Sequence, residues 1–77
     1  MTHKDARSVY ERYNVTEHNI KKRDLLTYCR RRNARMELHH GGCSYADIAR
    51  FENLLFGARD DRSRIKHSLF PNKARPR

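Results

Sequence analysis

The chain has 77 residues, of which 18 are Lys or Arg and nine are Asp or Glu, giving a formal net charge of +9. Leu, Ile, Val and Phe account for only 14 residues, so one small core is the most that the chain can form. No apolar run approaches the roughly 18 residues of a membrane-spanning helix and none resembles a signal peptide, so we expect an intracellular protein in a reducing compartment.

The spacing of apolar residues predicts helices along the chain and no strand. The first helix covers about residues 5–13, where Val9, Tyr10 and Tyr13 form a short apolar side. It is expected to end near Asn14.

The second predicted helix is the longest. Thr16 or Asn19 is its expected N-cap, and it runs to about Leu38, before the segment 39–42 with its two glycines ends it. At 100° per residue its apolar side lies opposite most of its arginines, with Arg32 at the flank. The residues expected to face the core are Leu25, Leu26, Cys29, Asn33 and Met36.

Two shorter helices follow. Ser44 caps the third, with Asp47 three residues later in an arrangement like a capping box, and Gly57 is suited to the left-handed conformation after its last residue. One of the pair Asp60-Asp61 caps the fourth helix, which Pro71 ends.

These elements predict an all-α fold. We expect a small bundle of three to four helices in a single domain over residues 1–70, with the second and third helices forming an antiparallel hairpin. Residues 71–77 contain no Leu, Ile, Val, Met or aromatic residue and are expected to form a basic, partly disordered tail.

Positive charge is concentrated in two blocks. Residues 21–35 carry seven Lys or Arg against the single acid Asp24, and residues 62–77 carry six basic residues and no acid. Arg outnumbers Lys by 13 to 5, which favours bidentate contacts with phosphate, and binding to phosphates also releases counterions. The predicted partner is a nucleic acid, RNA more than DNA, with Tyr28 stacking on a base. The expected contacts are Lys21, Lys22, Arg23, Tyr28, Arg30, Arg31, Arg32, Arg35, Arg62, Arg64 and Lys66.

Two cysteines and two histidines lie within residues 29–43. Cys29, His39, His40 and Cys43 are of the residue types that bind zinc, but their spacing is unusual, and we expect no cofactor. Unlinked cysteines are favoured over a disulfide between them. Residues 30–43 loosely resemble the basic stretch of small carlavirus nucleic-acid-binding proteins, in which an arginine cluster leads into a Cys-x-x-Cys zinc motif; the later Cys and His of that motif are absent here.

Two functions are therefore considered. The leading hypothesis is a small basic RNA-binding protein, either a ribonucleoprotein subunit or a viral accessory protein, that contacts phosphates through its arginine-rich helix. The alternative is a small protein-interaction subunit of a larger assembly, such as an organellar complex, supported by Leu54, which projects away from the other apolar residues of its helix. Neither is an enzyme, because so small a core does not easily build the pocket that nucleophilic catalysis by Cys43 requires.

Overall fold

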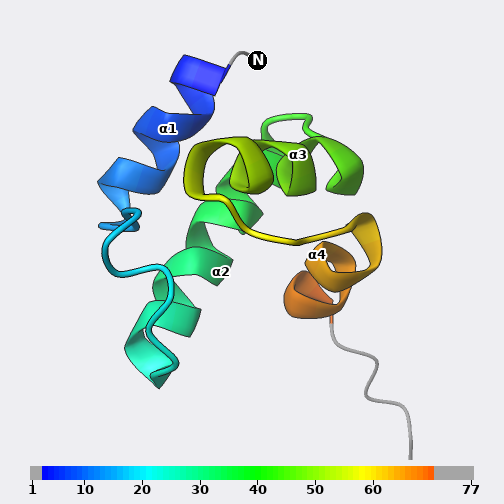
Figure 1. The fold of residues 1–77 in the computed structure, drawn as a ribbon. Helices are drawn as coiled ribbons and strands as arrows, with labels where there is room; N and C mark the ends of the chain where they lie inside the picture. The colour runs from blue at the N-terminus through cyan, green and yellow to red at the C-terminus, as the bar shows by residue number, and fades with distance from the viewer. Residues whose placement is uncertain (1–2, 71–77) are drawn as a thin grey trace, which may run out of the picture.

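The computed structural model describes residues 3–70, and these residues form four helices and no strand (Figure 1). The predicted all-α class is confirmed, whereas the predicted tail over residues 71–77 and the helix-ending Pro71 lie outside the described residues. None of the helices within this part of the chain combines the length and apolarity needed to cross a bilayer. The helices are α1 (His3–Arg12), α2 (Leu25–His40), α3 (Tyr45–Phe56) and α4 (Arg62–Leu69).

The ends of α3 and α4 agree with the sequence pattern. The Ser44 hydroxyl accepts a hydrogen bond from the Asp47 backbone N–H at 3.1 Å, and the Asp47 carboxylate accepts one from the Ser44 N–H, which completes the capping box. Gly57 has φ +67°, the left-handed conformation that glycine adopts without steric cost. Asp61 caps α4 by accepting from the Arg64 N–H at 2.9 Å.

The start of α2 differs from the prediction. The helix begins at Leu25, and Asp24 caps it by accepting from the Thr27 backbone N–H at 2.7 Å. Thr16 and Asn19 instead bond to each other, because each side chain accepts from the other's backbone N–H, at 2.9 and 3.2 Å. Such local side-chain bonds satisfy the backbone without a helix, so residues 13–24 form an irregular connection between α1 and α2.

The side of α2 that faces the core also differs from the prediction. Leu25 and Leu26 are 75% and 58% exposed, and Cys29 is exposed as well. Arg35, by contrast, is only 6% exposed. The predicted apolar face was therefore wrong for Leu25, Leu26, Cys29 and Asn33, whereas Met36 packs against the core as predicted. α2 is rotated so that the side bearing Arg31 and Arg35 lies against the other helices. Its buried residues are Thr27, Ala34, Arg35 and Leu38.

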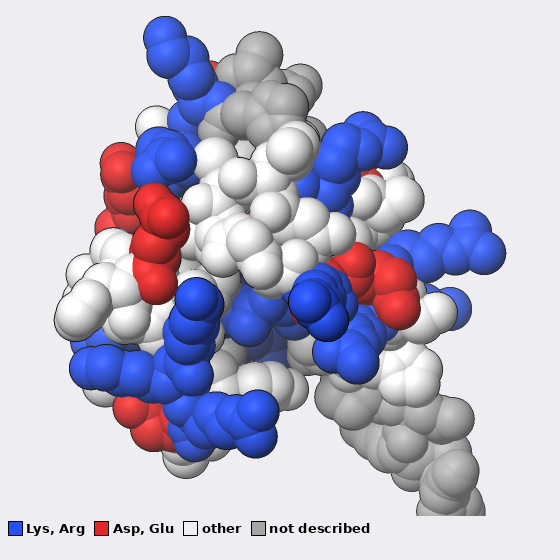
Figure 2. Space-filling model, viewed as in Figure 1, with Lys and Arg blue, Asp and Glu red and all other residues white. Residues whose placement is uncertain are grey.

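The positive surface is divided between two parts of the face seen in Figure 1. Lys and Arg side chains gather over the connection between α1 and α2, at the lower left, and again beside the connection between α3 and α4 (Figure 2). These connections are far apart in the sequence. The fold therefore brings basic residues from both onto one face of the molecule.

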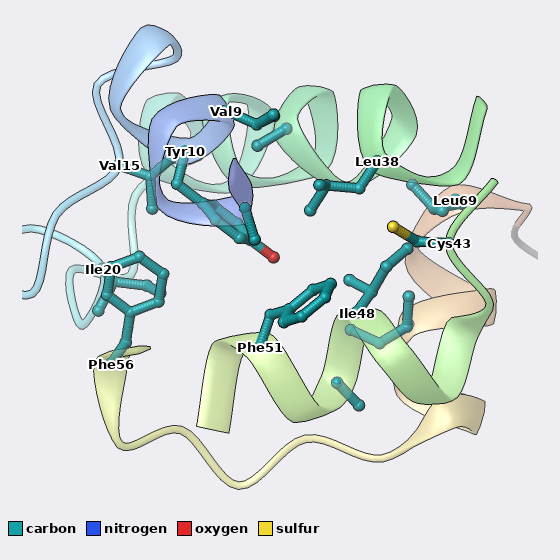
Figure 3. Close-up of a cluster of buried hydrophobic side chains, with 14 residues drawn as sticks. Val9, Tyr10, Val15, Ile20, Leu38, Cys43, Ile48, Phe51, Phe56 and Leu69 are labelled. Atoms are coloured by element: carbon teal, nitrogen blue, oxygen red, sulfur yellow. The ribbon is translucent and has the colours of Figure 1, made fainter. Parts of the chain in front are cut away.

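The core lies between α2 and α3, which face each other across it after the chain reverses at the glycine turn, as the predicted hairpin requires (Figure 3). α1 covers one end and α4 the other. The ring of Tyr10 packs edge-on against Phe56, with centroids 5.1 Å apart, and its hydroxyl points into the cluster. The buried apolar residues are Ala6, Val9, Tyr10, Val15, Ile20, Ala34, Leu38, Cys43, Ile48, Ala49, Phe51, Phe56, Ile65 and Leu69.

Replacing the α3 cap tests how much this small core depends on local signals. Ser44→Ala removes the bond to the Asp47 N–H, and we expect a loss of about 1 kcal/mol in the free energy of unfolding. Urea titration followed by circular dichroism measures it. Ser8→Ala, at an exposed position inside α1, is the matched control and should stay within about 0.5 kcal/mol of wild type. Equal urea midpoints for Ser44→Ala and wild type would show that the cap contributes nothing.

Candidate nucleic-acid interface

The arginines of α2 are organised by a buried carboxylate on α3. The Glu52 side chain has no solvent exposure and accepts hydrogen bonds from Arg35 Nε at 2.6 Å and from Arg31 Nε at 2.8 Å. The Tyr10 hydroxyl donates to the same carboxylate at 2.6 Å. A carboxylate taken out of water requires donors of this kind, and charged donors form the strongest bonds.

A second carboxylate completes the network. Arg31 donates to Asp60 Oδ2 at 2.7 Å, and Arg35 Nη2 lies 3.5 Å from the same oxygen. Arg35 also donates to the Ser68 hydroxyl at 2.8 Å. Two arginines of the predicted phosphate-binding run are thus neutralised by two acids of the same chain, and they tie α2 to α3, to the α3–α4 connection and to α4. We refer to Tyr10, Arg31, Arg35, Glu52 and Asp60 as the carboxylate network.

The pKa values of the acids report this pairing. Burial alone would raise the pKa of Glu52, but the hydrogen bonds and charge of Arg35, with the neighbouring Arg31, lower it to about 2. Burial and the adjacent Glu52 raise the pKa of Asp60. Burial and the Glu52 carboxylate also raise the pKa of Tyr10, which keeps its proton as the donor to Glu52.

Arg32 is held in a different way. Its Nε donates to the Ser68 carbonyl at 3.0 Å and its Nη2 lies 3.5 Å from the Leu69 carbonyl, so it caps the C-terminal end of α4. Arg30 is half-buried. The prediction that the arginine run faces solvent is therefore wrong for Arg31 and Arg35, because internal carboxylates bind them.

The sequence contains a signal for this network in the position of Glu52 on α3. Glu52 lies on the same side of α3 as Ile48 and Phe56, four residues before and after it, so a helix in the predicted orientation must bury it. A charged residue on an apolar helix face implies an oppositely charged partner. Local sequence does not determine which arginine pairs with Glu52.

Four exposed residues of the predicted contacts, Lys21, Lys22, Arg23 and Arg64, line a shallow groove of about 540 Å³ between the α1–α2 connection and the α3–α4 connection. Figure 2 shows basic side chains on both sides of this region. Its acidic residue, Asp60, is already bound by Arg31. We call this the basic groove. Its basic lining residues are Lys21, Lys22, Arg23, Arg31, Arg59 and Arg64.

Five of these six basic residues can offer their charge to a bound partner. Within residues 3–70, no salt bridge joins Lys21, Lys22, Arg23, Arg59 or Arg64 to an acid of that range. All five are exposed. Sequence reasoning missed Arg59, because its closeness to residues 21–23 arises only from the tertiary fold.

Tyr28 lies beside the groove. It is 49% exposed and lines a second hollow of about 540 Å³ that shares Lys22, Arg23 and Arg31 with the basic groove. An exposed aromatic ring next to a strip of cations is the arrangement used to stack unpaired bases above a bound backbone. On α4, Arg62 and Lys66 are exposed, and only Arg64 of the predicted α4 residues lines the groove.

The residues considered for zinc are not brought together. Across residues 3–70 there is no group of three or more His, Cys, Asp or Glu side chains placed to hold a metal ion. Cys29 is exposed, Cys43 is buried, and the two are not joined by a disulfide. His39 stacks on Tyr45, with centroids 4.7 Å apart, and its Nδ1 lies 3.2 Å from the Cys43 carbonyl.

Comparison of the chain with family models, with curated proteins and with solved structures finds no match. The partner is therefore inferred from the geometry and charge of the surface alone.

Removing the buried charge tests the carboxylate network. Glu52→Gln leaves Arg35 without its counterion, and we expect a loss of about 3–5 kcal/mol in the free energy of unfolding at pH 7. Because the folded-state pKa of Glu52 is lowered from 4.5 to about 2, its contribution is complete above pH 4.5 and is lost as the pH falls to about 2. The raised pKa of Asp60 opposes part of this loss.

The measurement is urea unfolding of wild type and variant between pH 7 and pH 2. The difference in the free energy of unfolding between wild type and Glu52→Gln should shrink as the pH falls below 4.5. Glu17→Gln, at an exposed position, is the control and should match wild type within about 0.5 kcal/mol. A Glu52→Gln variant as stable as wild type at pH 7 would contradict the structural role of the pair.

Tyr10→Phe removes one donor to Glu52 and keeps the ring, so it should lower the free energy of unfolding by about 1.5–3 kcal/mol in the same urea titration.

Proposed function

We propose that the protein is a non-catalytic RNA-binding protein whose basic groove holds the phosphate backbone. The observation that carries this proposal is the convergence of Lys21, Lys22 and Arg23 with Arg59 and Arg64 on one groove, without internal acids to neutralise them. Like charges brought together in this way repel one another, and a bound polyanion relieves that repulsion while releasing counterions.

The arginine-rich helix has a different role in this proposal from the one expected at first. Arg31 and Arg35 position the groove, because their bonds to Asp60 and Glu52 hold the α3–α4 connection against α2. The phosphates are contacted by side chains of the two connections and by Arg64 at the start of α4. Tyr28, beside the groove, supplies the stacking surface for an unpaired base, which favours single-stranded RNA over duplex.

A pair of charge-matched triple variants tests the groove. Lys21→Gln/Lys22→Gln/Arg59→Gln removes three groove charges, and Lys4→Gln/Arg7→Gln/Arg50→Gln removes three exposed charges outside it. Affinity for a fluorescent single-stranded RNA is measured from 50 to 300 mM salt. Each lost phosphate contact should reduce the slope of log K against log salt by about 0.7, so the groove triple should lose about 2 and the control little.

Equal slopes for the two triples would contradict the groove as the binding site. Failure of wild type to bind single-stranded or duplex RNA below about 10 μM at moderate salt would contradict RNA binding itself.

The alternative, a protein-interaction subunit, is supported by Leu54. This side chain is 61% exposed and borders a hollow of about 600 Å³ on the α3–α4 side, lined also by Ala46, Ala49 and Arg62. If a protein subunit is the partner, Leu54→Ala should weaken its recovery in a nuclease-treated pull-down from native cells and leave RNA affinity unchanged. Loss of all partners on nuclease treatment, with no effect of Leu54→Ala, would contradict the alternative.

A further inference from the structure

The hollow beside Tyr28 adjoins the basic groove. It has a volume of about 540 Å³, within the range of about 300–1,000 Å³ typical of small-ligand sites, and it shares Lys22, Arg23 and Arg31 with the groove. Leu25, which is 75% exposed, adds apolar surface to its lining. An RNA strand that follows the groove therefore reaches this hollow, which we call the Tyr28 hollow.

Part of the Tyr28 hollow is lined by one row of side chains on α2. Asp24, the N-cap, is followed by Tyr28 after four residues and by Arg31 after three more, so the three lie on one side of the helix. At 1.5 Å per residue, Asp24 lies about 6 Å before Tyr28 along the helix axis and Arg31 about 4.5 Å after it. A flat ring stacked on Tyr28 therefore has a carboxylate near one edge and a guanidinium near another.

Asp24 supplies a charged acceptor in a fixed position. Its Oδ1 accepts from the Thr27 backbone N–H at 2.7 Å, which orients the carboxylate. Hydrogen bonds from Thr27 lower the pKa of Asp24, so the carboxylate is ionised at neutral pH. Across residues 3–70 it takes part in no salt bridge, and it is exposed. A carboxylate has about four acceptor sites, so the bond to Thr27 leaves sites for the N–H groups of a ligand.

Arg31 supplies a donor that the carboxylate network does not use. Its Nε donates to Glu52 at 2.8 Å and its Nη2 to Asp60 at 2.7 Å, whereas Nη1 donates to no atom of residues 3–70. The Arg31 side chain is 23% exposed. Because Glu52 and Asp60 already neutralise its charge, Arg31 suits the uncharged acceptor atoms of a base better than a phosphate.

We propose that the Tyr28 hollow binds an unpaired guanine of the RNA, stacked on the Tyr28 ring. This inference rests on the proposed RNA binding. Guanine has two neighbouring donors, N1–H and the N2 amino group, for Asp24, and the acceptors O6 and N7 on the next edge for Arg31. Uracil would turn a carbonyl oxygen toward the carboxylate. Cytosine and adenine carry an amino group, but an acceptor nitrogen stands beside it, so neither base offers Asp24 a pair of donors.

Four fluorescent RNA oligomers test the base preference. Each is a chain of about ten uridines in which one central nucleotide is G, A, C or U. We expect the G oligomer to bind about tenfold more tightly than the U oligomer, with A and C closer to U. Equal affinity for the four oligomers would overturn the guanine site and leave RNA binding intact, whereas failure of all four to bind would overturn both proposals.

Asp24→Asn tests the carboxylate without removing the helix cap, because asparagine caps helices as well as aspartate does. Its amide has one acceptor oxygen and cannot receive both donors of guanine, so the preference for G over U should fall to about twofold or less. Asp61→Asn is the matched control, since it changes the N-cap of α4 and the net charge in the same way outside the Tyr28 hollow. It should keep the tenfold preference.

A preference that survives Asp24→Asn, or that both variants lose equally, would overturn the role of Asp24 and with it the guanine site. Circular dichroism checks that both variants fold as wild type does.

Guanosine monophosphate distinguishes a guanine within RNA from a free nucleotide. It carries one phosphate and makes few of the contacts that the basic groove offers to a strand. It should therefore displace the G oligomer only at concentrations at least roughly a hundredfold above those of unlabelled G oligomer. Displacement at equal concentrations would overturn RNA as the source of the base.

Discussion

The burial of the Glu52 carboxylate determines the arrangement of this small protein. A fully buried carboxylate needs charged donors, and Arg31 and Arg35 of α2 supply them together with the Tyr10 hydroxyl. Because both arginines lie on one side of α2, that side must face α3. The rotation of the longest helix about its axis is therefore set by an ion-pair network as much as by apolar packing. The exposure of its apolar residues follows from the same rotation.

The network also redistributes the charge that dominates the composition. Glu52 and Asp60 neutralise two of the arginines of α2, and Arg32 is used at the end of α4. The exposed basic residues of the groove then lie mainly on the two connections, at residues 21–23 and at Arg59, with Arg64 in the first turn of α4. A polyanion approaching this protein meets a groove built from connecting segments that helices hold in place. The helix with the most arginines mainly supports that groove.

How much of the fold and of the basic groove could be predicted from the sequence depended on how far apart in the sequence the interacting residues lie. The cap at Ser44 and the left-handed Gly57 were predicted correctly and Asp61 is one of the two caps named for α4, because each depends on residues within one helical turn. The N-cap of α2 is as local, but Asp24 was passed over for Thr16 or Asn19, whose side chains bond to each other's backbone instead. The rotation of α2 was predicted wrongly, because apolar spacing treats every arginine as a solvent-facing residue and takes no account of a partner 17 residues away. The basic groove was only half predicted, since Arg59 joins it through the tertiary fold.

The orientation of α2 sets apolar burial against ion pairing. A buried ion-pair network contributes little net stability compared with apolar packing, because desolvation offsets the attraction between the charges. Turning α2 over would bury Leu25 and Leu26, but it would expose Ala34 and Leu38 and leave the Glu52 carboxylate buried without its arginines. The observed orientation instead keeps Leu25 and Leu26 on the surface. The exposure of Leu25 and Leu26 is therefore the consequence of giving the buried carboxylate its charged donors.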